Sequence, residues 1–235
     1  MQIRAVLFDF AGTLFSPLPA DIWVAGAAGD IGLELTGNDV ASLAERCLAA
    51  GLPGAPYPSS VPDHVASAYA ERDLSPVAHR TAYVELLRGA VGGYPGLAEA
   101  IYGLVLEPRG WLPYPDARGV VDTLIARDVR VGLISNVGFD IRPILRHHGF
   151  EELARRCTLS FEHQVTKPDP RIFRIALDML GTEPAATLMV GDHLEADGAA
   201  AELGIHSLVW PMSPPGRDHG LERVLSAVSP GPDSA

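Results

Sequence analysis

Lysine is almost absent from this chain of 235 residues, in which Lys167 is the only one. Cysteine is also scarce: Cys47 and Cys157 lie far apart in no metal-ligand spacing, so we expect two reduced, buried thiols and a cytoplasmic protein. Long apolar runs are missing, and the run after Met1 ends at Asp9, too early for a signal peptide or a membrane span. These absences argue against a disulfide-stapled scaffold, and they leave one candidate for any reaction step that needs a side-chain amine.

Positive charge is in deficit, because 18 Lys and Arg residues stand against 29 Asp and Glu, a formal net charge of −11. Such an excess of negative charge repels the phosphates of nucleic acids and the surfaces of anionic membranes. We therefore expect neither a nucleic-acid partner nor a membrane partner. Hydrophobic residues make up 47% of the chain, enough apolar material for a packed globular protein. Only residues 229–235 are expected to form a flexible tail.

Short apolar runs typical of strands that are buried on both faces occur four times. They cover residues 3–8, 129–134, 187–190 and 205–210. Before the second and third of these runs, residues 117–125 and 172–180 carry apolar side chains at helical spacing, with Ile125 and Met179 on the apolar face. This alternation predicts an α/β fold with a Rossmann-like parallel sheet.

Strand signals disappear over residues 16–113, and helix signals replace them. We expect helices over residues 38–51 and 76–92, capped by Asn38 and Ser75. Pro-rich joints flank this insert, which suits a small lobe over the carboxyl ends of the strands, where open α/β folds bind ligands. The predicted organisation is therefore an α/β core domain of residues 1–15 and 114–228, and an α-helical cap domain of residues 16–113.

Polar residues follow the predicted strands at the places where each strand ends. Because the carboxyl ends of parallel strands meet at one edge of a sheet, we expect these residues to converge on one site. They fall into four groups: Asp9 to Thr13, Ser135-Asn136, Lys167, and Gly191-Asp192 with Asp197.

These four groups, in this order, resemble the four motifs of the haloacid dehalogenase-like superfamily, most of whose members are phosphatases. The resemblance spans nearly the whole chain and favours the subgroup with an α-helical cap after the first motif. It implies a Mg²⁺-dependent hydrolase of a small phosphorylated metabolite, in which Asp9 attacks phosphorus and forms an aspartyl-phosphate. Physically, a divalent cation between Asp9 and Asp192 would let a carboxylate approach an anionic phosphoryl group.

The resemblance also implies a role for each matching position. Asp9, Lys167 and Ser135 would be catalytic. Gly12, Thr13, Ser135, Asn136 and Lys167 would bind the substrate. Metal ligands would be Asp9, the backbone carbonyl of Ala11, Asp192 and Asp197, with Asp197 either a ligand or a support for the others.

Ala11 departs from the pattern, because phosphatases of this family carry an aspartate there as general acid and base. A positioned acid or base contributes on the order of 10²- to 10⁴-fold to the rate, so another group is needed. The candidate proton carriers are His193 and the insert residues His64, His79, Glu71 and Glu85. A leaving group that departs without protonation would also resolve the difficulty.

Members of this superfamily that lack an aspartate at this position also include proteins with different functions. A route like that of phosphonoacetaldehyde hydrolase needs a lysine in the cap, and the insert has none. A route like that of 2-haloacid dehalogenases, which usually have tyrosine at this position and use no metal, stays open as an alternative, although the acidic pair Asp192 and Asp197 argues against it. A third hypothesis is a catalytically impaired protein that binds a phosphorylated ligand.

Substrate recognition is expected to come from the insert. Most of its aromatic residues are expected in the core, and its arginines either meet a substrate anion or cover apolar neighbours. The aromatic residues in question are Trp23, Tyr57, Tyr69, Tyr83 and Trp111, and the arginines are Arg46, Arg72, Arg80 and Arg88.

Overall fold

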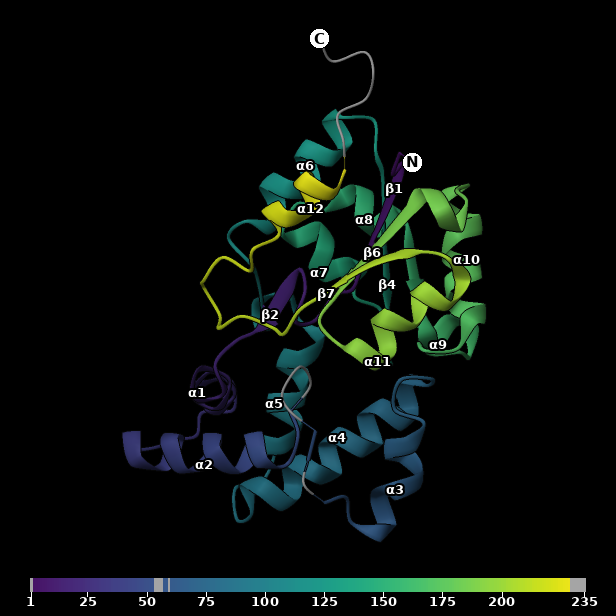
Figure 1. Cartoon of the computed structure of the whole chain (residues 1–235). Coiled ribbons are helices and arrows are strands. Elements are labelled where there is room, and N and C mark those ends of the chain that lie inside the picture. The colour runs from purple at the N-terminus through teal and green to yellow at the C-terminus, as the bar shows by residue number, and fades with distance from the viewer. Residues whose placement is uncertain (1, 53–56, 59, 229–235) are drawn as a thin grey trace.

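A computed structural model describes residues 2–52, 57–58 and 60–228 of the chain (Figure 1). The predicted tail, residues 229–235, lies outside them. From one edge to the other, the main sheet of the described residues contains β5 (Cys157–Leu159), β4 (Arg130–Ser135), β1 (Ala5–Phe8), β6 (Thr187–Gly191) and β7 (His206–Val209). All neighbouring strands pair in parallel, with β1 at the centre. The predicted α/β, Rossmann-like fold is therefore confirmed.

The four predicted strands are present with ends shifted by at most two residues. The edge strand β5 was not predicted, because its three residues are too few to show a pattern. It pairs with β4 from Leu133 to Ser135 and so continues the sheet by one strand.

Helices cover both faces of the sheet (Figure 1). Along β1, Val6 and Phe8 enter one apolar cluster while Ala5 and Leu7 enter the other, as the alternation of side chains along a strand requires. The helices α6 (Ala117–Ala126), α7 (Arg142–His147), α8 (Glu151–Arg155) and α12 (Glu222–Ala227) pack on the first face. The second face is covered by α10 (Pro170–Leu180) and the 3-10 helix Gly198–Leu203.

Two side chains predicted on the buried helix faces are exposed. Ile125 in α6 is 40% exposed and Met179 in α10 is 37% exposed. Each lies in the last turn of its helix, at the margin of an apolar stripe whose centre is buried. Both thiols are buried and free, as predicted, and burial raises the pKa of Cys47 to about 11.

The insert is helical, as predicted. Its described part contains α1 (Ala20–Asp30), α2 (Gly37–Ala49), α3 (Asp63–Ala70), α4 (Pro76–Val91) and α5 (Leu97–Leu106). Asn38 was wrongly predicted as the cap of α2. Thr36 takes that place, because its hydroxyl accepts from the Asp39 amide while the Asp39 carboxylate accepts from the Thr36 amide. Ser75 caps α4, as predicted.

Two short strands join the insert to the rest of the chain. They are β2 (Phe15–Pro17) and β3 (Trp111–Pro113), which pair antiparallel where the sequence indicated only Pro-rich joints. Phe10 stacks on Phe15 at 4.9 Å between ring centroids and packs against Trp111 at 4.8 Å. The apolar core is therefore continuous from the sheet into the insert. Among the described helices, none combines the length and the apolar character needed to cross a bilayer.

Candidate active site

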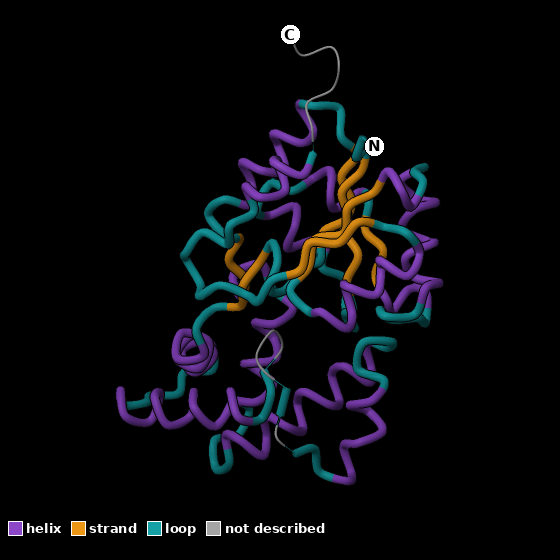
Figure 2. Tube along the Cα trace, viewed as in Figure 1, coloured by secondary structure: helices purple, strands orange, loops and turns teal. Residues whose placement is uncertain are grey.

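Three neighbouring strands, β4, β1 and β6, position most of the candidate residues at their carboxyl ends. The chain leaves β1 for β4 on one side and later enters β6 on the other, so the order of strands reverses at β1. Open α/β sheets bind ligands at the carboxyl ends of the strands at such a point. Asp9 follows β1 directly, Ser135 ends β4, and Asp192 follows β6. This edge of the sheet faces the helices of the insert (Figure 2).

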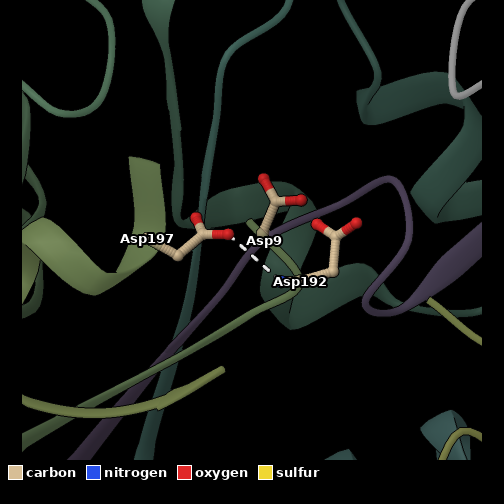
Figure 3. Close-up of side chains that lie close together, drawn as sticks. All are labelled: Asp9, Asp192 and Asp197. Carbon is tan, nitrogen blue, oxygen red and sulfur yellow. Dashed lines mark hydrogen bonds between the residues drawn. The ribbon is translucent and has the colours of Figure 1, made fainter. Parts of the chain in front are cut away.

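The acidic cluster, which we define as Asp9, Asp192 and Asp197, lies at this edge (Figure 3). Each residue offers a carboxylate oxygen, and these oxygens all lie within 4.8 Å of one another. Asp197 is held most firmly, since its Oδ2 accepts from the amides of Asp192 at 3.1 Å and His193 at 3.0 Å. The loop after β6 is therefore folded around the Asp197 carboxylate.

Lys167 lies against the acidic cluster and joins two of its members. Its Nζ donates to Oδ1 of Asp9 at 2.7 Å, to Oδ1 of Asp197 at 2.6 Å and to the carbonyl of Ile134 at 3.2 Å. The ammonium is buried, with 3% of the side chain exposed. Burial alone would lower its pKa, but the two carboxylates outweigh burial and raise it. Lys167 is therefore a permanent positive charge.

One ammonium does not neutralise three carboxylates. Burial raises the pKa of Asp9 to about 6, and Asp197 adds to the rise while Lys167 opposes it. Burial, together with the charges of Asp9 and Asp197, raises the pKa of Asp192 to about 7. The cluster thus has an excess of negative charge that a bound cation would relieve.

The residues present fit a divalent cation with oxygen ligands. A Cβ at Gly12 would lie 2.3 Å from Oδ2 of Asp192, so only glycine lets the first loop approach this carboxylate. Gly12 also has φ +83°, which glycine adopts readily. Among the hydrogen bonds of the described residues, none is accepted by the Ala11 carbonyl, which remains available. Carboxylates and a carbonyl are the ligands that Mg²⁺ prefers.

A pocket of about 300 Å³ opens between the acidic cluster and the insert. From the core it is lined by Asp9, Ala11, Gly12, Ser135, Asn136, Lys167, Asp192, His193, Ala196, Asp197 and Met212. From the insert it is lined by Gly51, Leu52, Tyr57, Pro58, Tyr69, Arg72, Asp73 and Tyr83. The acidic cluster and the fixed ammonium of Lys167 thus share one small pocket with side chains of the insert.

A family model of haloacid dehalogenase-like hydrolases matches residues 3–204, which is most of the chain. The protein belongs to the haloacid dehalogenase-like hydrolases.

Curated relatives with different activities match it. Phosphoserine phosphatase of Thermus thermophilus is 32% identical over 135 residues, 57% of this chain and 51% of that protein. (S)-2-haloacid dehalogenase 1 of Pseudomonas sp. is 29% identical over 96 residues, 40% of this chain and 42% of that protein. The chain therefore aligns with about half the length of these relatives.

Solved structures of haloacid dehalogenase-like proteins share the fold over almost the whole chain. The HAD hydrolase YfnB of Bacillus subtilis, bound to magnesium, superposes with a TM-score of 0.65 at 16% identity, over 97% of this chain and 100% of that one. A HAD phosphatase of Thermococcus onnurineus gives a TM-score of 0.59 at 18% identity, over 97% and 99%. At such identities the likeness shows the fold alone.

In this haloacid dehalogenase-like chain, all but one of the residues to which the resemblance assigns a role line the pocket. The exception is Thr13, which is completely buried and does not line it. The turn that begins at Phe10, with the Leu14 amide bonded to the Phe10 carbonyl, places Thr13 inside the protein, and its contact with the substrate stays a prediction.

Asn136 lines the pocket but its amide group is occupied. Its Nδ2 donates to the Lys167 carbonyl at 2.8 Å, and its Oδ1 accepts from the Lys167 amide at 2.7 Å. These two bonds fix the backbone that carries the ammonium. The structure therefore gives Asn136 a positioning contact, whereas Ser135, which is 3% exposed, remains a candidate to contact the substrate.

The predicted proton carriers of the insert lie away from the pocket. His64, Glu71, His79 and Glu85 do not line it. His79 is buried with Nδ1 at 2.8 Å from the Tyr102 hydroxyl, and burial lowers its pKa to about 3. His193 does line the pocket. Its Nδ1 accepts from the Ala196 amide at 3.2 Å as the cap of α11 (Leu194–Asp197).

Sequence reasoning missed Asp73, which lies on the loop between α3 and α4 and lines the pocket. The only available signal was its neighbour Arg72, one of four arginines named as candidates. Tyr57, Tyr69 and Tyr83 also line the pocket, although most aromatic residues of the insert were expected in the core. Trp23 and Trp111 are buried, as expected.

Proposed function

We propose that this protein is a Mg²⁺-dependent phosphohydrolase that acts on a small phosphorylated metabolite. The observation that carries the proposal is the acidic cluster with a single buried ammonium in the lining of a pocket of about 300 Å³. The size suits a small molecule rather than a macromolecule. The matching phosphoserine phosphatase of T. thermophilus supports a phosphorylated substrate.

Asp9 is the proposed nucleophile. Its Oδ1 accepts a hydrogen bond from Lys167, and the carboxylate lines the pocket in which a phosphoryl group would bind. A bond then forms between Asp9 and phosphorus while the bond from phosphorus to the leaving oxygen breaks. Water attacks phosphorus in the second half of the reaction, which breaks the bond to Asp9 and releases phosphate.

Asp9, Asp192 and the Ala11 carbonyl are the proposed magnesium ligands, with Asp197 supporting them or completing the set. When bound, the metal supplies positive charge that offsets the repulsion between substrate phosphate and carboxylate. Lys167 adds a second fixed positive charge, and Ser135 is placed to orient the phosphoryl oxygens. We further propose that residues 16–113 act as a cap domain over the core of residues 1–15 and 114–228.

The test is phosphate release from a panel of phosphate monoesters and acyl phosphates, with Mg²⁺ and with EDTA. Asp9→Asn should reduce release by several orders of magnitude, because the amide is a poor nucleophile. The exposed Asp218→Asn is the matched control and should behave as wild type.

Each alternative function gives a different result. Chloride release from 2-chloropropionate that persists in EDTA would replace the proposal by a dehalogenase without metal. If wild type releases no phosphate from any substrate while Ala11→Asp does, the chain is a catalytically impaired protein that binds a phosphorylated ligand.

A further inference from the structure

Asp73 is an acidic residue of the insert that faces the same pocket as Asp9 and Lys167. Resting on the phosphohydrolase function proposed above, we propose that Asp73 is the general acid and base of the reaction. It would give a proton to the leaving oxygen and later take one from the attacking water. The insert would then complete the catalytic machinery as well as cover it.

The loop that carries Asp73 is fastened to the core by hydrogen bonds to its backbone. Ser160 Oγ donates to the carbonyl of Asp73, and Gln164 Nε2 donates to the carbonyl of Leu74 at 2.6 Å. Ser160 Oγ also accepts from the Val137 amide at 2.8 Å, which ties the hydroxyl to the loop after β4. The position of Asp73 over the pocket is thus set by the sheet domain that holds Asp9.

The loop after β4 packs against the loop that carries Asp73, and we call this contact between core and insert the seam. A glycine of the first loop, Gly138, allows the close approach. A Cβ at Gly138 would lie 2.1 Å from the backbone oxygen of Arg72, the neighbour of Asp73. The loop after β4 and the loop that carries Asp73 are therefore in direct contact. Such a seam holds a catalytic group in place without a covalent link.

The surroundings of Asp73 allow both forms of its carboxyl group. Its side chain is 23% exposed, and Arg72 Nη2 lies 3.5 Å from its Oδ2, beyond ordinary hydrogen-bond distance. Burial raises its pKa, whereas Arg72 and Lys167 lower it. Asp73 and Lys167 both line the pocket.

The other titratable groups of the pocket are less suited to proton transfer. Lys167 is held protonated by two carboxylates. Burial raises the pKa of Tyr69 and of Tyr83, so neither loses its proton near neutrality. His193 has one ring nitrogen engaged as a helix cap. Among the described residues that line the pocket, Asp73 is the carboxyl group that lies outside the acidic cluster.

Asp73 gives one proton in the first half-reaction and takes one back in the second, so the protons balance. In the first, protonated Asp73 gives its proton to the leaving oxygen as the bond from that oxygen to phosphorus breaks and the Asp9–phosphorus bond forms. In the second, ionised Asp73 takes a proton from the water whose oxygen binds phosphorus as the Asp9–phosphorus bond breaks. The products are an alcohol and phosphate, and Asp73 is returned protonated.

The test compares two substrates with Mg²⁺: a phosphate ester of a simple alcohol, whose alkoxide needs a proton to leave, and 4-nitrophenyl phosphate, whose phenolate does not. Asp73→Asn should lower kcat/KM for the alkyl ester by about 10²- to 10⁴-fold. With 4-nitrophenyl phosphate it should release about one equivalent of nitrophenolate per active site in a burst, because the phosphorylated Asp9 forms but hydrolyses slowly. Glu71→Gln, exposed on the same loop, is the matched control and should resemble wild type.

Distinct results would overturn the proposal. An equal loss on both substrates without a burst would show a structural role for Asp73, and full activity on both would show no role. A loss specific to the alkyl ester in His193→Gln, with Asp73→Asn unaffected, would assign proton transfer to His193. All of these leave the phosphohydrolase function standing, whereas the absence of Mg²⁺-dependent phosphate release in wild type would overturn both proposals.

Discussion

Replacing Asp192 with Asn should stabilise the metal-free protein, although the same change should weaken magnesium binding. The reason is the electrostatic repulsion within the acidic cluster. In the folded protein, burial and the charges of Asp9 and Asp197 raise the pKa of Asp192 from 3.8 to about 7. The folded state therefore binds this proton more tightly than the unfolded state, and ionisation of Asp192 destabilises the fold.

The size of the effect follows from the shift in pKa. At 1.36 kcal/mol for each factor of ten in proton affinity, a rise from 3.8 to about 7 corresponds to about 4 kcal/mol. Asp192 is only partly buried, so solvent screening reduces this to about 2 kcal/mol. For a chain of this length the melting temperature should rise by roughly 4–8 °C.

The assay is thermal unfolding in EDTA at two pH values. Stability is lost as the pH rises from 3.8 through about 7, so the advantage of Asp192→Asn should be complete at pH 8 and less than half as large at pH 5. Asp218→Asn, an exposed acid, should change neither value. Added Mg²⁺ should raise the melting temperature of wild type much more than that of Asp192→Asn. A variant no more stable than wild type at pH 8 would refute the reasoning.

Two further substitutions test the ammonium and the seam. Lys167→Met should lower the free energy of unfolding by about 3–5 kcal/mol, measured in urea, because it leaves two buried carboxylates without their partner; an unchanged midpoint would contradict the assignment of a buried ion pair. Gly138→Ala should lower kcat/KM by about 10- to 100-fold, because its Cβ must displace the backbone of Arg72. The control is Gly89→Ala, since a Cβ there meets nothing within 4 Å. Equal kcat/KM values for both alanine variants would show that the seam does not position the site.

The core of the site could be predicted because its residues follow strands. A buried parallel strand is recognisable as an apolar run, and the carboxyl ends of such strands lie at the same edge of the sheet. Asp9, Ser135 and Asp192 therefore lie close together whatever the conformation of the segments between them. Lys167 was grouped with these strand-end residues, but α9 (Ser160–His163) and not a strand precedes it, so that part of the prediction was wrong. The resemblance to a known family supplied its role.

Contacts between distant segments were harder to predict. Thr13 is buried by a tight turn whose direction depends on the packing around Phe10. Asn136 binds the backbone of Lys167, 31 residues away, an arrangement that no local pattern reports. The short strand β5 could not be predicted for a similar reason. Its three residues form a strand because they pair with β4, which no local pattern reports.

The side of the pocket formed by the insert shows why the group that compensates for Ala11 could not be identified from the sequence. The candidates for a substitute acid were histidines and glutamates, and those of the insert do not line the pocket. Asp73 lies on a loop, and its place depends on Ser160 and Gln164, which are close to it only after the insert has packed on the sheet. An acid/base side chain that is missing from the loop after β1 can be replaced only by a side chain that the tertiary structure brings to the same pocket. The replacement is therefore to be sought among insert residues that contact the core.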